Sequence, residues 1–471
     1  MKKFNSTAAA GYLAAILMFL LFSTLIGCGD KISVEDDTAE VLVADSVRQF
    51  YHAWLADCVN DEIRDTSHWW SGYDPTEELT NLATSRISSA IASPIITSQI
   101  GVENLAWGPA LVIDFDGGDQ YTPKNLMYCL KSASSKGDSA VYHVGIAGTN
   151  MISHYDWFTE DLQVYEQVDW APGGKISAGS MVAVSKIDGL GSNGQTLLEY
   201  LQSELSQNSN MIINVAGHSL GGALTQVYSS HLKQQLTTST ASPSVVAWVY
   251  AGPSAGNDVF AQTSVQQLDG YNAHNNSRDL VPHAWQEDML AQLCTVYNGD
   301  SICGSQITDN NAINGFIEYL HWMANNSVNN YTIPGKPVLF TGENAILSSD
   351  DCDGVSAAID LFWKTGDFND VYLRMEAIYQ QCSGGSDISY DEFSTFFYYL
   401  TEMGYQHTSA YLDHFITNQD LKDTINVYVP GATGYLTDAD NIDQGKLLIE
   451  DALNGAKDTL LVHNITDCNC Q

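Results

Sequence analysis

Residues 211–224 read MIINVAGHSLGGAL. The first half of this run is apolar and rich in β-branched residues, and the second half continues as a helical pattern to about residue 235, which predicts a buried strand, a sharp turn and a helix. Ser219 lies in the turn, flanked by Gly217 and Gly221, where any side chain would collide with the neighbouring strand or helix. Such a turn strains the backbone and lifts the serine hydroxyl above the sheet, so Ser219 is the candidate nucleophile.

Further apolar runs rich in β-forming residues occur along the chain, at residues 110–115, 140–146, 245–251 and 337–340. A second helix-like stretch, residues 194–206, lies between two of them. Strands that alternate with helices indicate a mostly parallel sheet with helices on both faces. We therefore expect one main α/β domain over residues 39–471, with a helical, aromatic insertion at about 348–397.

A second glycine-flanked serine, Ser254 in the stretch GPSAG, competes with Ser219. It also follows an apolar run. The carboxylate that suits it as a partner, Asp279, follows so soon that little room remains for an intervening strand and helix. We therefore interpret Ser254 as the end of a strand that lines the floor of the site.

Two other segments, on either side of residues 211–224, resemble the class 3 lipase family. Upstream, residues 141–150 read VYHVGIAGTN and are followed by Asp156 and Trp157; downstream, residues 250–257 read YAGPSAGN. The resemblance covers about residues 105–285 and implies an α/β-hydrolase fold and a serine hydrolase that cleaves fatty acyl esters without a cofactor. The sequence departs from the family at Ala147, where the family usually has arginine, so the charge contacts behind this turn must differ.

A serine hydroxyl needs a histidine to take its proton, and the histidine needs a carboxylate. The chain order in this fold is serine, acid, histidine. Residues 279–282 read DLVP, which resembles the family's D-x-V-P motif and implies that Asp279 is the acid; the alternative is a turn aspartate paired with Arg278.

The base should follow the last predicted strand, at residues 337–340. His407 does so and resembles the family's histidine, so we assign it as the base. His414 lies close behind and also resembles the family pattern, and His321 precedes the strand; both remain open alternatives.

The resemblance also implies an oxyanion hole and a lid. The backbone N–H groups of Leu220 and Thr149 are expected to hold the oxyanion, with the Thr149 hydroxyl as a further donor. In the family a mobile lid follows the turn that contains Thr149. Several apolar side chains lie at that point and are suited either to meeting a lipid surface or to packing the sheet edge: Met151, Ile152, Tyr155, Trp157 and Phe158.

The first 27 residues contain Lys2 and Lys3, no acidic residue and a long apolar run that ends in LIGC, with Cys28 as its last residue. This pattern predicts a bacterial lipoprotein signal peptide, with Cys28 lipidated and residues 28–38 as a tether. The alternative is an uncleaved membrane anchor, since the run is nearly the length of about 20 residues that spans a bilayer. Both place the protein outside the cytoplasm and next to lipid, at the outer membrane or cell surface.

The cysteines and the charge fit this placement. Apart from Cys28, eight of the nine cysteines remain, so up to four disulfides are possible; Cys294 with Cys303, and Cys352 with Cys382, would close short loops. Without Lys2 and Lys3, 17 of the 19 basic residues remain against 56 acidic ones, a formal charge of −39 instead of −37. Such a chain repels nucleic acid.

Residues 387–393 read DISYDEF and resemble the end of a calcium-binding loop. The oxygen ligands that such a loop needs upstream would be Gln381, Ser383 and Gly385, a poor set, so we predict no metal there. The sequence as a whole predicts a monomeric, membrane-anchored hydrolase of acylglycerols or similar fatty acyl esters. Alternatives are a phospholipase, a short-chain esterase, or a surface lipoprotein that binds lipid without catalysis.

Overall fold

The computed structural model describes residues 44–430 except for these gaps: 61, 63, 66–73, 116–119, 134–138, 150–163, 165, 172, 240, 291, 309, 315, 318–319, 321–330, 346–351, 353–354, 357–358 and 360–388. The predicted signal peptide, Cys28 and the tether lie outside the described residues, as do the five apolar residues of the expected lid. Within the described part of the chain, no helix is both long enough and apolar enough to cross a membrane.

An eight-stranded sheet forms the centre of the molecule, in the order β1-β3-β4-β9-β10-β11-β14, with β2 paired to β3. Strands β4, β9, β10, β11 and β14 are parallel to one another, whereas β1, β2, β3 and β4 pair antiparallel at one side. The strands are β1 (Arg64–Asp65), β2 (Glu103–Phe115), β3 (Gln120–Ser132), β4 (Ala140–Ile146), β9 (Met211–His218), β10 (Ser244–Tyr250), β11 (Gly270–Asn276) and β14 (Val338–Phe340).

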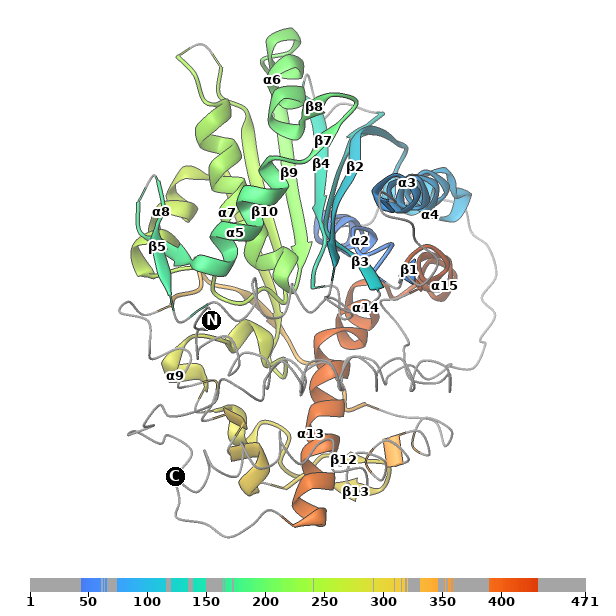
Figure 1. Cartoon of the computed structure of the whole chain (residues 1–471), viewed down its shortest axis with the longest axis vertical. Helices are drawn as coiled ribbons and strands as arrows, with labels where there is room; N and C mark the ends of the chain where they lie inside the picture. Colours follow the sequence, from blue (N-terminus) through green and yellow to red (C-terminus); the bar gives the residue numbers. More distant parts are fainter. Residues whose placement is uncertain are drawn as a thin grey trace, which may run out of the picture.

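Helices cover both faces of the sheet (Figure 1), which confirms the predicted α/β-hydrolase architecture. The central strands β4 and β9 are mostly apolar because they are buried on both faces. One face carries α2 (Asp45–Leu55), α3 (Thr76–Ala92), α4 (Pro94–Ile100), α14 (Ser409–Phe415) and α15 (Gln419–Tyr428). The other carries α5 (Ala178–Asp188), α6 (Leu197–Gln207), α7 (Leu220–Leu236) and α8 (Asp258–Gln267).

A long helix, α13 (Tyr390–His407), runs from a lower layer of the molecule up to the edge of the sheet (Figure 1). Its start is set by a capping box in which Ser389 and Glu392 bond each other's backbone N–H groups. Short elements make up the rest: β5 (Gln167–Asp169), β6 (Lys175–Ser177), β7 (Gly191–Ser192), β8 (Gln195–Thr196), η2 (Val281–His283), α9 (Glu287–Leu290), η3 (Leu293–Thr295), β12 (Ser301–Ile302) and β13 (Ser305–Gln306).

The predicted strands all lie within or next to observed ones, but β3 and β11 have no clear sequence signal. β11 reads GYNAHNN and is polar, yet Asn275 and Asn276 are buried, because they meet another part of the chain rather than solvent. The predicted boundary of the late insertion at 397 falls inside α13, which continues unbroken to His407. The proposed calcium ligands at 381, 383 and 385 lie outside the described residues.

The structure corrects the suggested disulfides. Cys303 bonds to Cys352, with a Cα–Cα distance of 5.4 Å, so the suggested Cys294–Cys303 and Cys352–Cys382 pairs are wrong. Cys129 is a buried thiol outside any disulfide, so the eight cysteines do not all pair. Nearness in sequence fails as a guide here because the bonded cysteines are 49 positions apart, and Cys352 lies at the β12–β13 turn.

Candidate active site

Ser219 occupies a strained turn between β9 and α7. Its backbone has φ 57° and ψ −126°, a region that side chains rarely adopt. A Cβ at Gly217 would lie 2.1 Å from the carbonyl oxygen of Gly221, and one at Gly221 would lie 2.4 Å from that of Ile146. Both glycines are therefore required for the turn, as the sequence indicates.

The structure brings Ser219, His407 and Asp279 into one hydrogen-bonded chain. The Ser219 hydroxyl lies 2.8 Å from Nε2 of His407, and Nδ1 of the same ring lies 2.8 Å from Oδ2 of Asp279. Asp279 is fully buried and His407 nearly so. The second oxygen of Asp279 accepts a hydrogen bond from the backbone N–H of Val281 at 3.0 Å, which fixes the plane of the carboxylate.

The other histidines lie elsewhere or have different partners. His414 is exposed, and its ring stacks on Phe340 at 3.9 Å between centroids. Nδ1 of His283 lies 2.7 Å from the backbone oxygen of Asp279 and not from its carboxylate. His321 lies outside the described residues. Among the described histidines, the one in contact with both Ser219 and Asp279 is His407.

Ser254 lies in a buried loop after β10, and its own backbone is not in the left-handed region. Positive φ falls on Ala251 in this region, not on the serine. The loop is held to α7 by Gln226, whose amide donates to the carbonyl of Pro253 and accepts from the N–H of Ala255. The Ser254 hydroxyl is buried and has no hydrogen-bond partner among the described residues.

His218, the residue before Ser219, supports His407 from behind. Its Nε2 donates to the backbone carbonyl of His407 at 2.8 Å, and its ring packs against those of Trp54, His407 and Tyr411. Burial, together with the nearby His407, holds the pKa of His218 well below its usual range, so the ring is neutral. Sequence reasoning did not identify this contact, which joins residues 189 positions apart.

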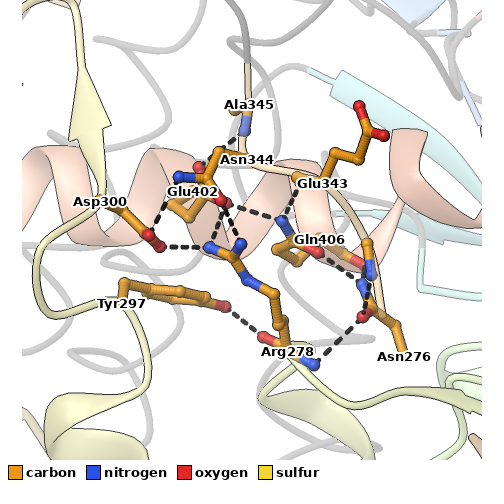
Figure 2. Close-up of polar contacts among 10 residues, drawn as sticks. Asn276, Arg278, Tyr297, Asp300, Glu343, Asn344, Ala345, Glu402 and Gln406 are labelled. Atoms are coloured by element: carbon orange, nitrogen blue, oxygen red, sulfur yellow. Dashed lines mark hydrogen bonds and ion pairs between the residues drawn. The ribbon is translucent and has the colours of Figure 1, made fainter. Parts of the chain in front are cut away.

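A polar network ties the chain segment that holds Asp279 to the helix that ends in His407 (Figure 2). Arg278 bonds to Glu402 at 2.9 Å and also to Asp300 and Asn344, so it does not pair with Asp279. One turn further along α13, Gln406 accepts from the side chain of Asn276 at 2.6 Å and donates to Glu402 at 2.7 Å. Because Arg278 precedes Asp279 and Gln406 precedes His407, the network fixes the separation of the acid and the base.

The turn expected to form the oxyanion hole lies directly beside Ser219. A Cβ placed on Gly148 would be 2.9 Å from the carbonyl of His218 and 3.5 Å from Cβ of Ser219. Thr149 follows at this edge and is half-buried. Leu220 begins α7, where the first N–H groups have no acceptor within the helix. These positions are suited to the assigned roles of Thr149 and Leu220.

A buried carboxylate holds this turn in place, and the sequence gives no signal for it. Asp57 accepts from the backbone N–H of Gly148 at 2.8 Å and from the amide of Asn60 at 3.0 Å. One of these contacts is thus to the residue directly after Ala147. Burial raises the pKa of Asp57 from near 3.8 to about 7, against the opposing effect of the two hydrogen bonds.

Replacing Asp57 with asparagine is expected to change how stability depends on pH. The folded chain binds an extra proton at Asp57 between pH values near 3.8 and about 7, so this contribution to the free energy of unfolding falls as pH rises through that window. The difference between these two pKa values corresponds to about 4 kcal/mol in the free energy of unfolding. Urea unfolding at a series of pH values should therefore show Asp57→Asn gaining stability relative to the wild type as pH rises.

The matched control is Asp269→Asn, at a more exposed carboxylate that pairs with Lys233. It shows the effect of removing a carboxylate away from the oxyanion turn, against which the Asp57→Asn curve is compared. Parallel curves for the wild type and Asp57→Asn would contradict a raised pKa of Asp57 in the folded chain.

Comparisons with known proteins find a family that part of the chain resembles. Residues 143–289 match the sequence profile of the lipase (class 3) family. Among solved structures, the chain is similar to M37 lipase, with a TM-score of 0.54 and 18% identity over 82% of this chain and 98% of that one. This similarity supports the α/β-hydrolase fold.

Two fungal structures are more distant. The lipase from Rhizopus microsporus var. chinensis has a TM-score of 0.32 and 16% identity, covering 55% of this chain and 79% of that one. Lipase II from Rhizopus niveus has a TM-score of 0.33 and 18% identity, covering 53% and 78%. No curated protein matches the chain significantly. Residues 143–289 are therefore similar to the class 3 lipase family.

Proposed function

We propose that the protein hydrolyses carboxylic esters through an acyl-enzyme formed on Ser219. The observation that carries the proposal is the chain of contacts from Ser219 through His407 to Asp279, each link 2.8 Å long. The Ser219 oxygen attacks the ester carbonyl carbon as His407 takes the hydroxyl proton at Nε2. Asp279 fixes the tautomer of His407 and stabilises its charged form.

The remaining steps use the same groups. The N–H groups of Leu220 and Thr149 stabilise the oxyanion of the tetrahedral intermediate. His407 then returns its proton to the alcohol oxygen, the ester C–O bond breaks, and the acyl group stays on Ser219. Water, with its proton taken by His407, attacks the acyl-enzyme and releases the carboxylic acid. No step requires a cofactor.

We further propose that the substrates are acylglycerols or similar fatty acyl esters. The match of residues 143–289 to the class 3 lipase family supports this substrate class. Phospholipids and short soluble esters share the same scissile bond and are the alternatives within the class. A lipid anchor at Cys28, proposed from the sequence alone, would hold a monomeric enzyme on the outer side of a bacterial membrane, where such lipids occur.

Hydrolysis rates across a chain-length series test this proposal. We expect release of fatty acid from emulsified triacylglycerols and from long-chain p-nitrophenyl esters, and covalent labelling of Ser219 by a fluorophosphonate, located by peptide mass mapping. Hydrolysis restricted to short esters or to phospholipids would contradict the proposed substrate class but would be consistent with the acyl-enzyme mechanism. If the folded protein is not labelled by the fluorophosphonate and hydrolyses none of these esters, the result would favour the alternative of a non-catalytic lipid-binding protein.

A further inference from the structure

Three buried side chains with metal-ligand chemistry meet on the face of the sheet covered by α2, apart from the triad. His52 comes from α2, Glu103 is the first residue of β2, and His143 lies in β4. Nε2 of His52 is 3.2 Å from Oε1 of Glu103, and Nε2 of His143 is 3.6 Å from the same oxygen. One ligand atom from each residue falls within 4.8 Å of the other two.

These polar atoms are buried with few partners. His52 is fully buried, and His143 and Glu103 are 1% and 6% exposed. Nδ1 of His52 has no hydrogen-bond partner among the described residues, and Nε2 of His52 and Oε1 of Glu103 make only the ion-pair contacts given above. Burying polar groups without hydrogen bonds is unfavourable, and a bound cation is one way to compensate such groups.

The separations fit a small tetrahedral ion. Ligand atoms at about 2.0–2.1 Å from zinc lie about 3.3 Å from one another. The 3.2 Å and 3.6 Å separations are close to this value before any adjustment of the side chains. Two imidazoles and one carboxylate form a ligand set that zinc commonly uses.

A second layer of contacts orients His143 as such a site requires. Its Nδ1 faces the side-chain amide of Gln49, at 2.9 Å from Nε2 and 3.3 Å from Oε1. With the amide oxygen turned to accept from Nδ1, the lone pair of Nε2 points to the cluster. Ser132 lies 3.0 Å from that Nε2 and offers a hydroxyl beside the open fourth position.

We propose that His52, Glu103 and His143 bind one zinc ion per chain, with water or the Ser132 hydroxyl as the fourth ligand. The site would join α2 to β2 and β4 and so anchor the helix that leads to Asp57 and the oxyanion turn. Its role is therefore structural, and it takes no part in the reaction at Ser219. Binding releases any proton carried by His52.

The rival explanation is a metal-free charge network. In that case a protonated His52, with Arg48 acting electrostatically on Glu103, balances the carboxylate. The two explanations differ in what the folded chain does with a free metal ion.

Metal analysis of the purified full-length chain separates them. After removal of metal with a chelator, we expect the protein to take up one Zn²⁺ per chain, to give the visible bands of tetrahedral Co²⁺ with cobalt, and to gain thermal stability with either ion. Glu103→Gln and His143→Gln, which keep polar side chains of similar size, should lose this stoichiometric binding. Gln49→Leu should weaken it by about 10- to 100-fold.

Two controls locate the ion. His231→Ala removes a partly exposed histidine that pairs with Asp188, and His407→Ala removes the base at Ser219; both should keep one ion per chain. X-ray absorption on the wild-type zinc form should show two imidazoles per zinc, a readout that does not depend on whether the variants fold. No binding by the wild type, binding that survives Glu103→Gln, loss of the ion in His407→Ala, or sulfur ligands would each overturn the proposal.

Discussion

Ser219→Ala is expected to lower kcat by about 10⁶-fold, because the oxygen that forms the acyl-enzyme is removed and only the oxyanion hole and substrate binding remain. Labelling by a fluorophosphonate should disappear with it. Both effects can be measured on the triacylglycerol or ester that the wild type hydrolyses fastest. Ser254→Ala is the matched control, since Ser254 occupies the other glycine-flanked pentapeptide and its hydroxyl has no hydrogen-bond partner in the described part of the chain. It should keep both activity and labelling.

The same position should show a conflict between stability and function. Ser219 has a φ of 57°, and strain of this kind is worth about 1–3 kcal/mol. Ser219→Gly removes the hydroxyl and also relieves the strain, so it should be inactive but more stable to urea than Ser219→Ala. A substantial rate in either variant, or loss of labelling in Ser254→Ala, would show that the nucleophile lies elsewhere.

The nucleophile turn could be predicted because its information is local. A strand, two glycines around a serine and a helix lie within one short stretch, and the close contacts of Gly217 and Gly221 explain the glycines. The central strands were predicted for a similar reason, since burial on both faces requires apolar runs. Asp279 followed from a local motif as well.

The rest of the site depends on contacts that no local pattern records. Asp57 reaches Gly148 from 91 positions away, and Arg278 reaches Glu402 across 124. Polar residues such as Asn276 and Glu402 look like surface residues in the sequence, but both are buried and each is hydrogen-bonded to Gln406. The choice among histidines had the same difficulty, because His407 and His414 lie one helix apart and only the packing of α13 separates their environments.

The start of α13 shows how one pattern can fit two structures. Acidic and hydroxyl residues around position 389 resemble the end of a calcium loop. In the structure, Ser389 and Glu392 instead cap the first turn of the helix, where acidic residues are also favoured by the helix dipole. The same oxygens that would bind a cation accept backbone N–H groups.

His407→Ala is expected to lower kcat by about 10⁴- to 10⁶-fold, because no other group described here lies within hydrogen-bond distance of both the Ser219 hydroxyl and Asp279. His414→Ala is the matched control: it removes an exposed ring that stacks on Phe340 and should leave kcat nearly unchanged. In Asp279→Asn, kcat should fall by about 10⁴-fold although the protein still folds, because an amide favours the wrong tautomer of His407.

The double variant tests whether Ser219 and His407 contribute to kcat together or independently. If Ser219 and His407 act as one unit, Ser219→Ala combined with His407→Ala should be no slower than Ser219→Ala alone, since the base has no proton to take once the hydroxyl is gone. If the losses in kcat of the two single variants instead multiply in the double variant, His407 assists catalysis by another route. Full activity in His407→Ala with a large loss in His414→Ala would assign the base to α14, and the 2.8 Å contact with Ser219 would then have no catalytic role.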